Sequence, residues 1–263
     1  MKRVPVSLQD ALQFPTTDMV MPKPVDAGVR LTRDHVWMEL PQLRLRPEAI
    51  AKSGIVTISR SDPAHIVFDM LRTRVLQTMR RNGWTSIAIT SPTPGCGASL
   101  VAANLAFSLA HQKDCRTLLI DLNLKHPGID KLVGMTDPPS MEMFLEGNCD
   151  LTGIFRRYDE NLAIAANNWP VKFSAELLQS HRATKVLQDM QQTMNPEVIL
   201  YDLPPMLSCD DVTAFLPNVD CAILVVAAEQ STFDEVDACE RELAEKTNLL
   251  GVVLNKCQYG PGY

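Results

Sequence analysis

The feature that most constrains the fold of this chain is a regular alternation of short apolar segments with helix-like segments after residue 60. The apolar segments are residues 85–90, 116–121, 162–166, 197–202, 221–228 and 249–255. The segments with helical periodicity are residues 61–83, 99–112, 174–193 and 234–247. Nearly continuous apolar strands that alternate with helices are typical of a parallel sheet with helices on both faces. We therefore predict a single α/β domain over residues 56–257, built on a doubly wound, mostly parallel sheet.

The two ends of the chain lack this alternation. Residues 1–55 contain six prolines and little periodicity. Because proline is disfavoured in helix interiors and central strands, we predict an extended or partly disordered N-terminal arm. The arm would serve as a tether or, alternatively, as a docking segment for a partner. Residues 258–263 form a short tail that contains Tyr259 and Tyr263.

Composition excludes several classes of function. The net charge of −6 argues against a broad nucleic-acid surface, which needs clustered lysine and arginine. The seven cysteines are dispersed and include no CxxC pair, which favours reduced thiols of a cytoplasmic protein over disulfides or a zinc site. No apolar run approaches the roughly 20 residues of a membrane span. We therefore predict a cytoplasmic chain that binds no nucleic acid and needs a partner to reach a membrane.

The first helical segment, residues 61–83, has recognisable ends and two unlike faces. Ser61 or Asp62 can cap its start, and Gly83 can end it. Apolar residues recur at three- and four-residue spacing along one face. The other face carries Arg72, Arg74, Arg80 and Arg81. This basic face is either solvated or an interface for an acidic neighbour.

The sequence SPTPGCGASLVAANLA (91–106) joins the first apolar strand to a helix. Glycines at such a turn let the backbone curl around phosphate groups, and the helix N-terminus favours negative charge. Ser99 occupies the hydroxyl position that usually meets Mg²⁺. A phosphate-binding loop would have lysine at the position of Ala98. A tight strand-to-helix turn without a ligand also needs glycine, so the loop alone leaves both interpretations open.

Polar residues follow two further strands. Asp121 ends one apolar strand and is followed by Asn123, which can orient a water but cannot accept its proton. Asp202 ends another, in the position of an aspartate that assists Mg²⁺ in nucleotide-binding proteins. Ligands of open parallel sheets bind beyond the carboxyl ends of the strands. The three strand ends together predict a site for phosphate and magnesium.

Taken in chain order, seven segments closely resemble the bacterial tyrosine kinases (BY-kinases) of capsule and exopolysaccharide systems. The segments are LRT (71–73), ITSPTPGCGASLVAANLAFSLA (89–110), TLLIDLNLKHPGI (117–129), SAELLQS (174–180), VILYDLPPMLSCDDV (198–212), LVVAAEQSTFDEV (224–236) and GVVLNK (251–256). This family consists of P-loop NTPase-like proteins with deviant Walker motifs, related to the MinD and ParA ATPases. Its members bind ATP or ADP with Mg²⁺ and autophosphorylate C-terminal tyrosines. The resemblance implies a membrane-anchored polysaccharide chain-length regulator or export protein as partner, a peripheral location at the inner face of the cell membrane, and a homo-oligomer.

The resemblance also assigns roles to individual residues. The catalytic positions are Asp121, Asn123 and Asp202. The metal positions are Ser99, Asp121 and Asp202. The nucleotide-binding positions are Gly95, Cys96, Gly97, Ala98, Ser99, Leu100 and Asn255. Lys125 and Asp211 match a basic residue and a further aspartate of the family.

Several of these positions depart from the family. The P-loop lysine falls on Ala98, the next hydroxyl on Leu100, and the partner of the first aspartate on Asn123. The family's leading helix carries Glu-x-x-Arg-x-x-Arg, which builds an oligomer interface. Here the three positions read Ile66, Asp69 and Arg72.

These departures favour a regulator of polysaccharide synthesis or export with impaired catalysis that still binds Mg-nucleotide. The alternative is an active ATP-dependent tyrosine autokinase of the same pathway, rescued by Lys125 or by an arginine from another chain. A third interpretation, a positioning ATPase like MinD or ParA, is disfavoured because the chain lacks a C-terminal amphipathic helix and a basic character.

Overall fold

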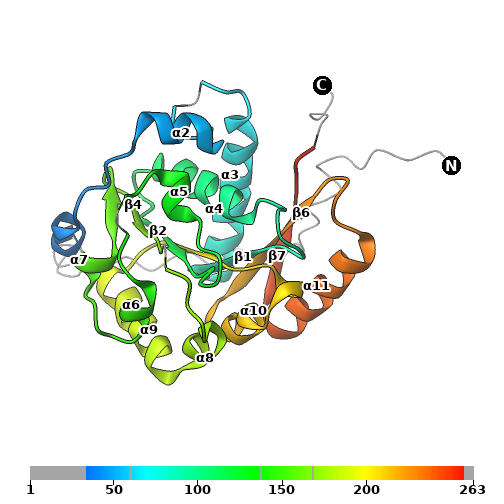
Figure 1. Ribbon diagram of the computed structural model, residues 1–263. Coiled ribbons are helices and arrows are strands. Elements are labelled where there is room, and N and C mark those ends of the chain that lie inside the picture. Colours follow the sequence, from blue (N-terminus) through cyan, green and yellow to red (C-terminus); the bar gives the residue numbers. More distant parts are fainter. Residues whose placement is uncertain (1–33, 60, 137, 168, 258–263) are drawn as a thin grey trace.

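The computed structural model of the protein describes residues 34–59, 61–136, 138–167 and 169–257. Seven strands in this part form one sheet, in the order β3-β4-β2-β5-β1-β6-β7 (Figure 1). The strands are β1 (Ser86–Thr90), β2 (Thr117–Asp121), β3 (Arg156–Tyr158), β4 (Leu162–Ala165), β5 (Val198–Asp202), β6 (Cys221–Ala227) and β7 (Asn248–Asn255). All neighbouring strands run parallel except β3 and β4. The predicted α/β fold with a mostly parallel sheet is confirmed.

Six of these strands were predicted, and each of their ends lies within one residue of the expected position. Every residue of β1, β2, β4, β5 and β6 is buried, as expected of strands with helices on both faces. The sequence gives no sign of β3, because this edge strand is only three residues long and begins with two arginines.

Helices cover both faces of the sheet, and each layer has its own apolar core (Figure 1). The helices of the first layer are α2 (Pro47–Ser53), α3 (His65–Asn82), α4 (Ala98–Ala110) and α5 (Ile129–Val133). The second layer contains α6 (Met141–Leu145), α7 (Leu151–Ile154), α8 (Ser174–Gln179), α9 (His181–Met194), α10 (Asp211–Phe215) and α11 (Phe233–Lys246), with the short 3₁₀ helices η1 (Met206–Ser208) and η2 (Leu216–Asn218). None of the helices in the described ranges is long and apolar enough to span a membrane.

The ends of two predicted helical segments can be compared with the structure. The predicted cap at Ser61 or Asp62 is wrong, because α3 begins at His65 and its N-cap, Ala64, has no side-chain cap. The Asp62 carboxylate accepts the Ala64 N–H at 2.9 Å in the turn before the helix, and Gly83 ends the helix with a φ of 68° as predicted. The segment 174–193, predicted as one helix pattern, is two helices that meet at Ser180. The Ser180 hydroxyl accepts the Ala183 N–H at 3.0 Å and so starts a new helix, as serine at an N-cap commonly does.

The prediction of an extended arm is wrong for residues 34–39 and 47–53, which are helical, while residues 1–33 lie outside the described part. Residues 34–39 are helical, and Trp37 is 1% exposed. The Trp37 indole N–H donates to the Met194 carbonyl at 2.9 Å, and the Arg116 guanidinium lies 5.2 Å from the ring centre. Pro47 sits in the first turn of α2, where proline is tolerated. The prolines therefore mark helix ends and connections in this segment.

After the first of these helices, the chain pairs with the edge of the sheet. Gln42 forms a parallel bridge with Arg157 of β3. The Arg157 N–H donates to the Pro41 carbonyl at 2.8 Å, and the Leu43 N–H donates to the Arg157 carbonyl at 2.7 Å. Residues 41–43 thus occupy the outer side of β3.

Candidate functional site

A pocket of about 820 Å³ lies at the carboxyl ends of β1, β2 and β5. Four segments line it: the loop between β1 and α4, the segments that follow β2 and β5, and the last turn of α2. Three of these were predicted to meet from the order of the strands. The fourth was not, because α2 lies in the segment that was predicted to be an extended arm.

The loop between β1 and α4 has the tight curl that its glycines predict. Gly95 and Gly97 have φ angles of 85° and 89°, which residues with a side chain rarely adopt. A Cβ at Gly97 would lie 2.4 Å from the Asn255 Nδ2 atom. The same Nδ2 donates to the Cys96 carbonyl at 2.8 Å, and Gln230 Nε2 donates to the Pro94 carbonyl at 2.9 Å. Side chains from β7 and from the turn before α11 therefore hold the loop from outside.

Two residues assigned to nucleotide binding do not line the pocket. Asn255 holds the loop backbone, as described above. The Cys96 side chain is buried, with its sulfur 3.5 Å from the Ser231 hydroxyl and 3.7 Å from the Thr93 hydroxyl. A contact between Asn255 and a base stays a prediction.

Ala98, Ser99 and Leu100 form the first turn of α4 and line the pocket. The first N–H groups of a helix have no partner within it and carry its positive end, so this turn suits an anion. The Ala98 side chain adds only a methyl group at this point. The loop therefore keeps the backbone donors of a phosphate site without the lysine.

Asp121 and Asp202 end adjacent strands in direct register, and both are fully buried. The Asp121 carboxylate accepts three backbone N–H groups at 3.1 Å each, from Asn123, Gly128 and Ile129. Neither oxygen of Asp202 has a hydrogen bond of normal geometry within the described residues. The Ser99 hydroxyl is close enough to lower the pKa of Asp202 without forming such a bond. Of the two carboxyl groups, that of Asp202 is therefore the one whose oxygens lack hydrogen-bond partners among the described residues.

The environment of the two carboxyl groups opposes ionisation. Burial raises the pKa of Asp121 above the usual aspartate range, although its backbone hydrogen bonds oppose the shift. Burial raises the pKa of Asp202 well above that range, and the neighbouring Asp121 raises it further. A cation bound between the strand ends would favour the ionised forms of both.

The remaining polar groups of the site are Asn123 and the pair of Lys125 and Asp211. Asn123 lines the pocket, and its buried Oδ1 has no partner among the described residues. Lys125 Nζ lies 2.9 Å from Asp211 Oδ1 and 4.0 Å from Asp210 Oδ1. The hydrogen bond to Asp211 raises the pKa of Lys125. The positive charge of Lys125 is thus balanced by Asp211. Lys125 is therefore a poor substitute for a lysine at position 98.

These side chains fit a magnesium ion that is held jointly with phosphate. Mg²⁺ takes oxygen ligands and is usually bound by one or two carboxylates together with phosphates and water. Asp202 offers unpaired buried oxygens, and Ser99 offers a hydroxyl beside it. No cluster of three His, Cys, Asp or Glu side chains that could hold a metal occurs in the described ranges. Oxygens of phosphate and water would complete the coordination of a metal bound here.

Comparison with known proteins identifies the family. No protein-family model matches the sequence. Tyrosine-protein kinase CpsD of Streptococcus pneumoniae serotype 4 is 30% identical over 181 residues, which cover 65% of this chain and 75% of CpsD. The chain belongs to the bacterial tyrosine-kinase family. The EpsB protein of Ralstonia solanacearum is 28% identical over 196 residues, which cover 74% of this chain and 26% of EpsB. This BY-kinase chain thus spans about a quarter of that relative's length.

Solved structures agree with this assignment. The chimeric protein CapA2B2 superimposes with a TM-score of 0.71 at 25% identity, covering 86% of this chain and 98% of the chimera. The septum site-determining protein MinD of Pyrococcus horikoshii, solved with Mg-ADP, superimposes with a TM-score of 0.55 at 23% identity, covering 68% and 72%. The second likeness shows the fold alone. The predicted relation to P-loop NTPases such as MinD is confirmed at the level of fold.

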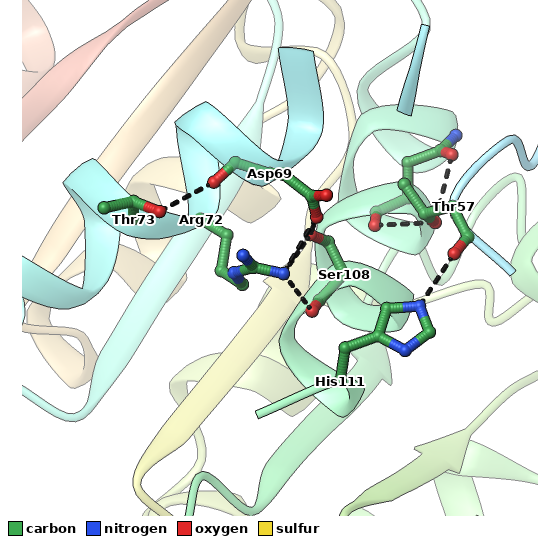
Figure 2. A network of polar contacts seen from close by, with 7 residues as sticks. Thr57, Asp69, Arg72, Thr73, Ser108 and His111 are labelled. Carbon is green, nitrogen blue, oxygen red and sulfur yellow. Dashed lines mark hydrogen bonds and ion pairs between the residues drawn. The ribbon is translucent and has the colours of Figure 1, made fainter. Parts of the chain in front are cut away.

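The three positions that match the family's interface motif lie on α3, and two of them, Asp69 and Arg72, contact their own chain (Figure 2). Arg72 is 11% exposed and donates to Asp69 at 2.8 Å and to the Ser108 carbonyl at 3.0 Å. The Ser108 hydroxyl donates to the same Asp69 oxygen at 2.7 Å. Ile66, which replaces the motif's glutamate, is 51% exposed. The charged residues of the motif therefore join α3 to α4 within the chain.

Proposed function

We propose that this BY-kinase chain is a regulator of capsule or exopolysaccharide synthesis or export that binds Mg-ATP or Mg-ADP and has little or no kinase activity. Its nucleotide-binding residues would be the loop backbone from Gly95 to Leu100, with Ser99 and Asp202 toward the metal. Asp121 would support the metal side of the site through the charge of its carboxylate.

The observation that carries this proposal is the methyl group of Ala98 at the start of α4. Loss of one neutral donor from an oxyanion site costs roughly 3–4 kcal/mol, or about 10²–10³ in rate. A fixed cation beside developing phosphate charge contributes at least as much. Asn123 adds to the loss, because its amide cannot accept the proton of an attacking hydroxyl.

Binding depends on different groups from catalysis. The N–H groups of the first turn of α4 are backbone atoms and do not need a lysine. The free oxygens of Asp202 favour a cation at the same place. These two features support retained, weak binding of a magnesium–nucleotide complex.

The biological setting follows from the family resemblance. We propose a cytoplasmic location with peripheral attachment through a membrane-anchored chain-length regulator or export protein, and no role for nucleic acid. Self-association remains part of the proposal, although the motif residues Asp69 and Arg72 are used within the chain. Tyr259 and Tyr263, the candidate acceptors, lie outside the described residues.

The test compares the wild type with Ala98→Lys. Calorimetric titration with Mg-ADP and Mg-ATP measures binding, and phosphotyrosine mapping after incubation with ATP measures transfer. We expect weak binding and no ATP-dependent labelling in the wild type, and tighter binding in the variant. Robust labelling of Tyr259 or Tyr263 in the wild type would overturn the proposal in favour of an active autokinase.

A further inference from the structure

The last turn of α2 brings an exposed lysine to the mouth of the pocket. Lys52 and Ser53 both line the pocket, from a helix that lies in the same layer as α4 and α5 (Figure 1). Gly54 ends α2 with a φ of 80° and turns the chain toward α4. A Cβ at Gly54 would lie 3.4 Å from Leu100 Cδ2, so this turn packs closely on the first turn of α4.

Residues 54–57 are fixed to α4 by hydrogen bonds. Asn104 Oδ1 accepts the Val56 N–H at 2.9 Å, and Asn104 Nδ2 donates to the Gly54 carbonyl at 3.2 Å. The Thr57 hydroxyl donates to the Asn104 carbonyl at 3.0 Å. The Thr57 carbonyl lies 2.9 Å from His111 Nε2, and Figure 2 shows this contact. Because α4 begins at the loop, these contacts hold the end of α2 at a fixed place beside it.

The Lys, Arg, His, Asp and Glu side chains that line the pocket are all basic. The wall includes the basic side chains Lys52, Lys125, His126 and Lys131 and no aspartate or glutamate. Lys125 is paired with Asp211, and Lys131 follows Asp130, whose pKa it lowers against the opposing effect of burial. Lys52 has no ion pair among the described residues. It is therefore the lysine of the wall whose charge is most available to a ligand.

We infer that Lys52 binds the phosphates of the nucleotide and supplies from α2 the positive charge that the loop lacks at Ala98. The inference rests on the proposed nucleotide site and names a residue that completes it. It also gives one physical account of two departures from the family. With Ala98 the loop lacks both the long side chain and the positive charge of the lysine. The apolar side chain of Leu100 packs against the turn that follows Lys52.

The experiment measures affinity for Mg-ADP and for tripolyphosphate in the full chain, with Lys52→Gln as the test variant. A charge-assisted contact to phosphate predicts a loss of about 10-fold or more in affinity for both ligands. Lys52→Arg keeps the charge and should retain most of the binding. Lys113→Gln, an equal charge change beyond the other end of α4, is the matched control and should bind as the wild type does.

A double variant tests whether Lys52 supplies the positive charge that a lysine at position 98 would provide. In an Ala98→Lys background, Lys52→Gln should cost much less than it does alone, because the loop then carries its own cation. Circular dichroism and the melting temperature verify that each variant is folded. Equal affinity of wild type and Lys52→Gln would overturn the inference and leave the proposed function standing. A wild type that binds neither ligand would overturn both.

Discussion

Asp121 and Asp202 stand in direct register on neighbouring strands, yet only Asp121 has hydrogen-bond partners for its oxygens. The backbone thus donates hydrogen bonds to one carboxyl group, while the other is buried with both oxygens unpaired, and neither carboxyl group lines the pocket. Such an unpaired buried acid lowers the stability of the protein without a ligand. Its energetic effect can be measured directly.

Asp202→Asn should stabilise the protein at neutral pH. Because the pKa of Asp202 is raised in the folded state, the folded chain holds more protons than the unfolded chain once the pH exceeds about 4. Its contribution to the free energy of unfolding therefore falls as the pH rises toward the folded-state pKa. Removing the acid should add about 1 kcal/mol or more at pH 7 and flatten this decline.

Urea unfolding of both proteins between pH 5 and pH 8 measures this effect. Asp114→Asn, at an exposed turn, is the control and should change the stability by less than about 0.5 kcal/mol at pH 7. A variant that is less stable than the wild type at pH 7 would show that Asp202 is satisfied in the folded protein.

Gly97→Ala should distort the loop. The added Cβ would meet the Asn255 side chain at 2.4 Å, and the φ of 89° is unfavourable for alanine. We expect a loss of about 1–3 kcal/mol in stability and a marked loss of Mg-ADP affinity. Gly128→Ala is the matched control for stability, since its φ is −150° and no atom lies within 4 Å of the added Cβ. Thermal unfolding compares the two variants and calorimetric titration measures the affinity of Gly97→Ala; equal stability of the two variants would contradict the described loop geometry.

Trp37→Ala should destabilise the whole domain. The side chain is 1% exposed, donates a hydrogen bond to Met194 and lies against Arg116. Truncation of a buried aromatic residue costs roughly 3–5 kcal/mol. The neighbouring Met38 is 75% exposed, so Met38→Ala should change stability by less than about 0.5 kcal/mol. Denaturant unfolding separates the two outcomes, and equal stability would place residues 34–40 outside the cooperative unit.

Arg72→Ala should weaken the contact between α3 and α4. The guanidinium bonds to Asp69 and to two atoms of Ser108, so its loss should cost about 1.5–3 kcal/mol. Arg80→Ala, at an exposed position of the same helix, should cost less than about 0.5 kcal/mol. Sedimentation should give the same association state for both variants as for the wild type. A selective loss of association in Arg72→Ala would assign this residue to an interface between chains.

The sequence predicts the sheet well because strands that are buried on both faces consist almost entirely of apolar residues. VILYD (198–202) and CAILVVA (221–227) are apolar almost throughout, and both are strands with every residue buried. The loop and the two strand-end aspartates follow from the same order, since parallel strands bring their carboxyl ends together. That the two aspartates are in register and that Asp202 lies near Ser99 of the loop therefore needed no information beyond the alternation.

Contacts between distant segments produce no such local pattern of apolar residues. Gln230 holds the loop through the Pro94 carbonyl, across 136 positions of the chain. Lys52 reaches the pocket only because α2 packs beside the first turn of α4, and nothing in its neighbouring residues indicates this. Trp37 is a single buried aromatic in a segment without periodicity. In these cases one long-range contact decides the position, and local patterns cannot predict it.

The pairing of residues 41–43 with β3 bears on how the domain should be handled. An uncovered strand edge is a template for pairing with other molecules, and natural proteins cover or disrupt such edges. A chain shortened to begin at residue 56, the boundary that the sequence suggests, would uncover the outer side of β3 and empty the site of Trp37. Such a fragment should aggregate through its open edge. The association state measured for the fragment would then result from the uncovered edge of β3 and would not represent the assembly of the intact protein.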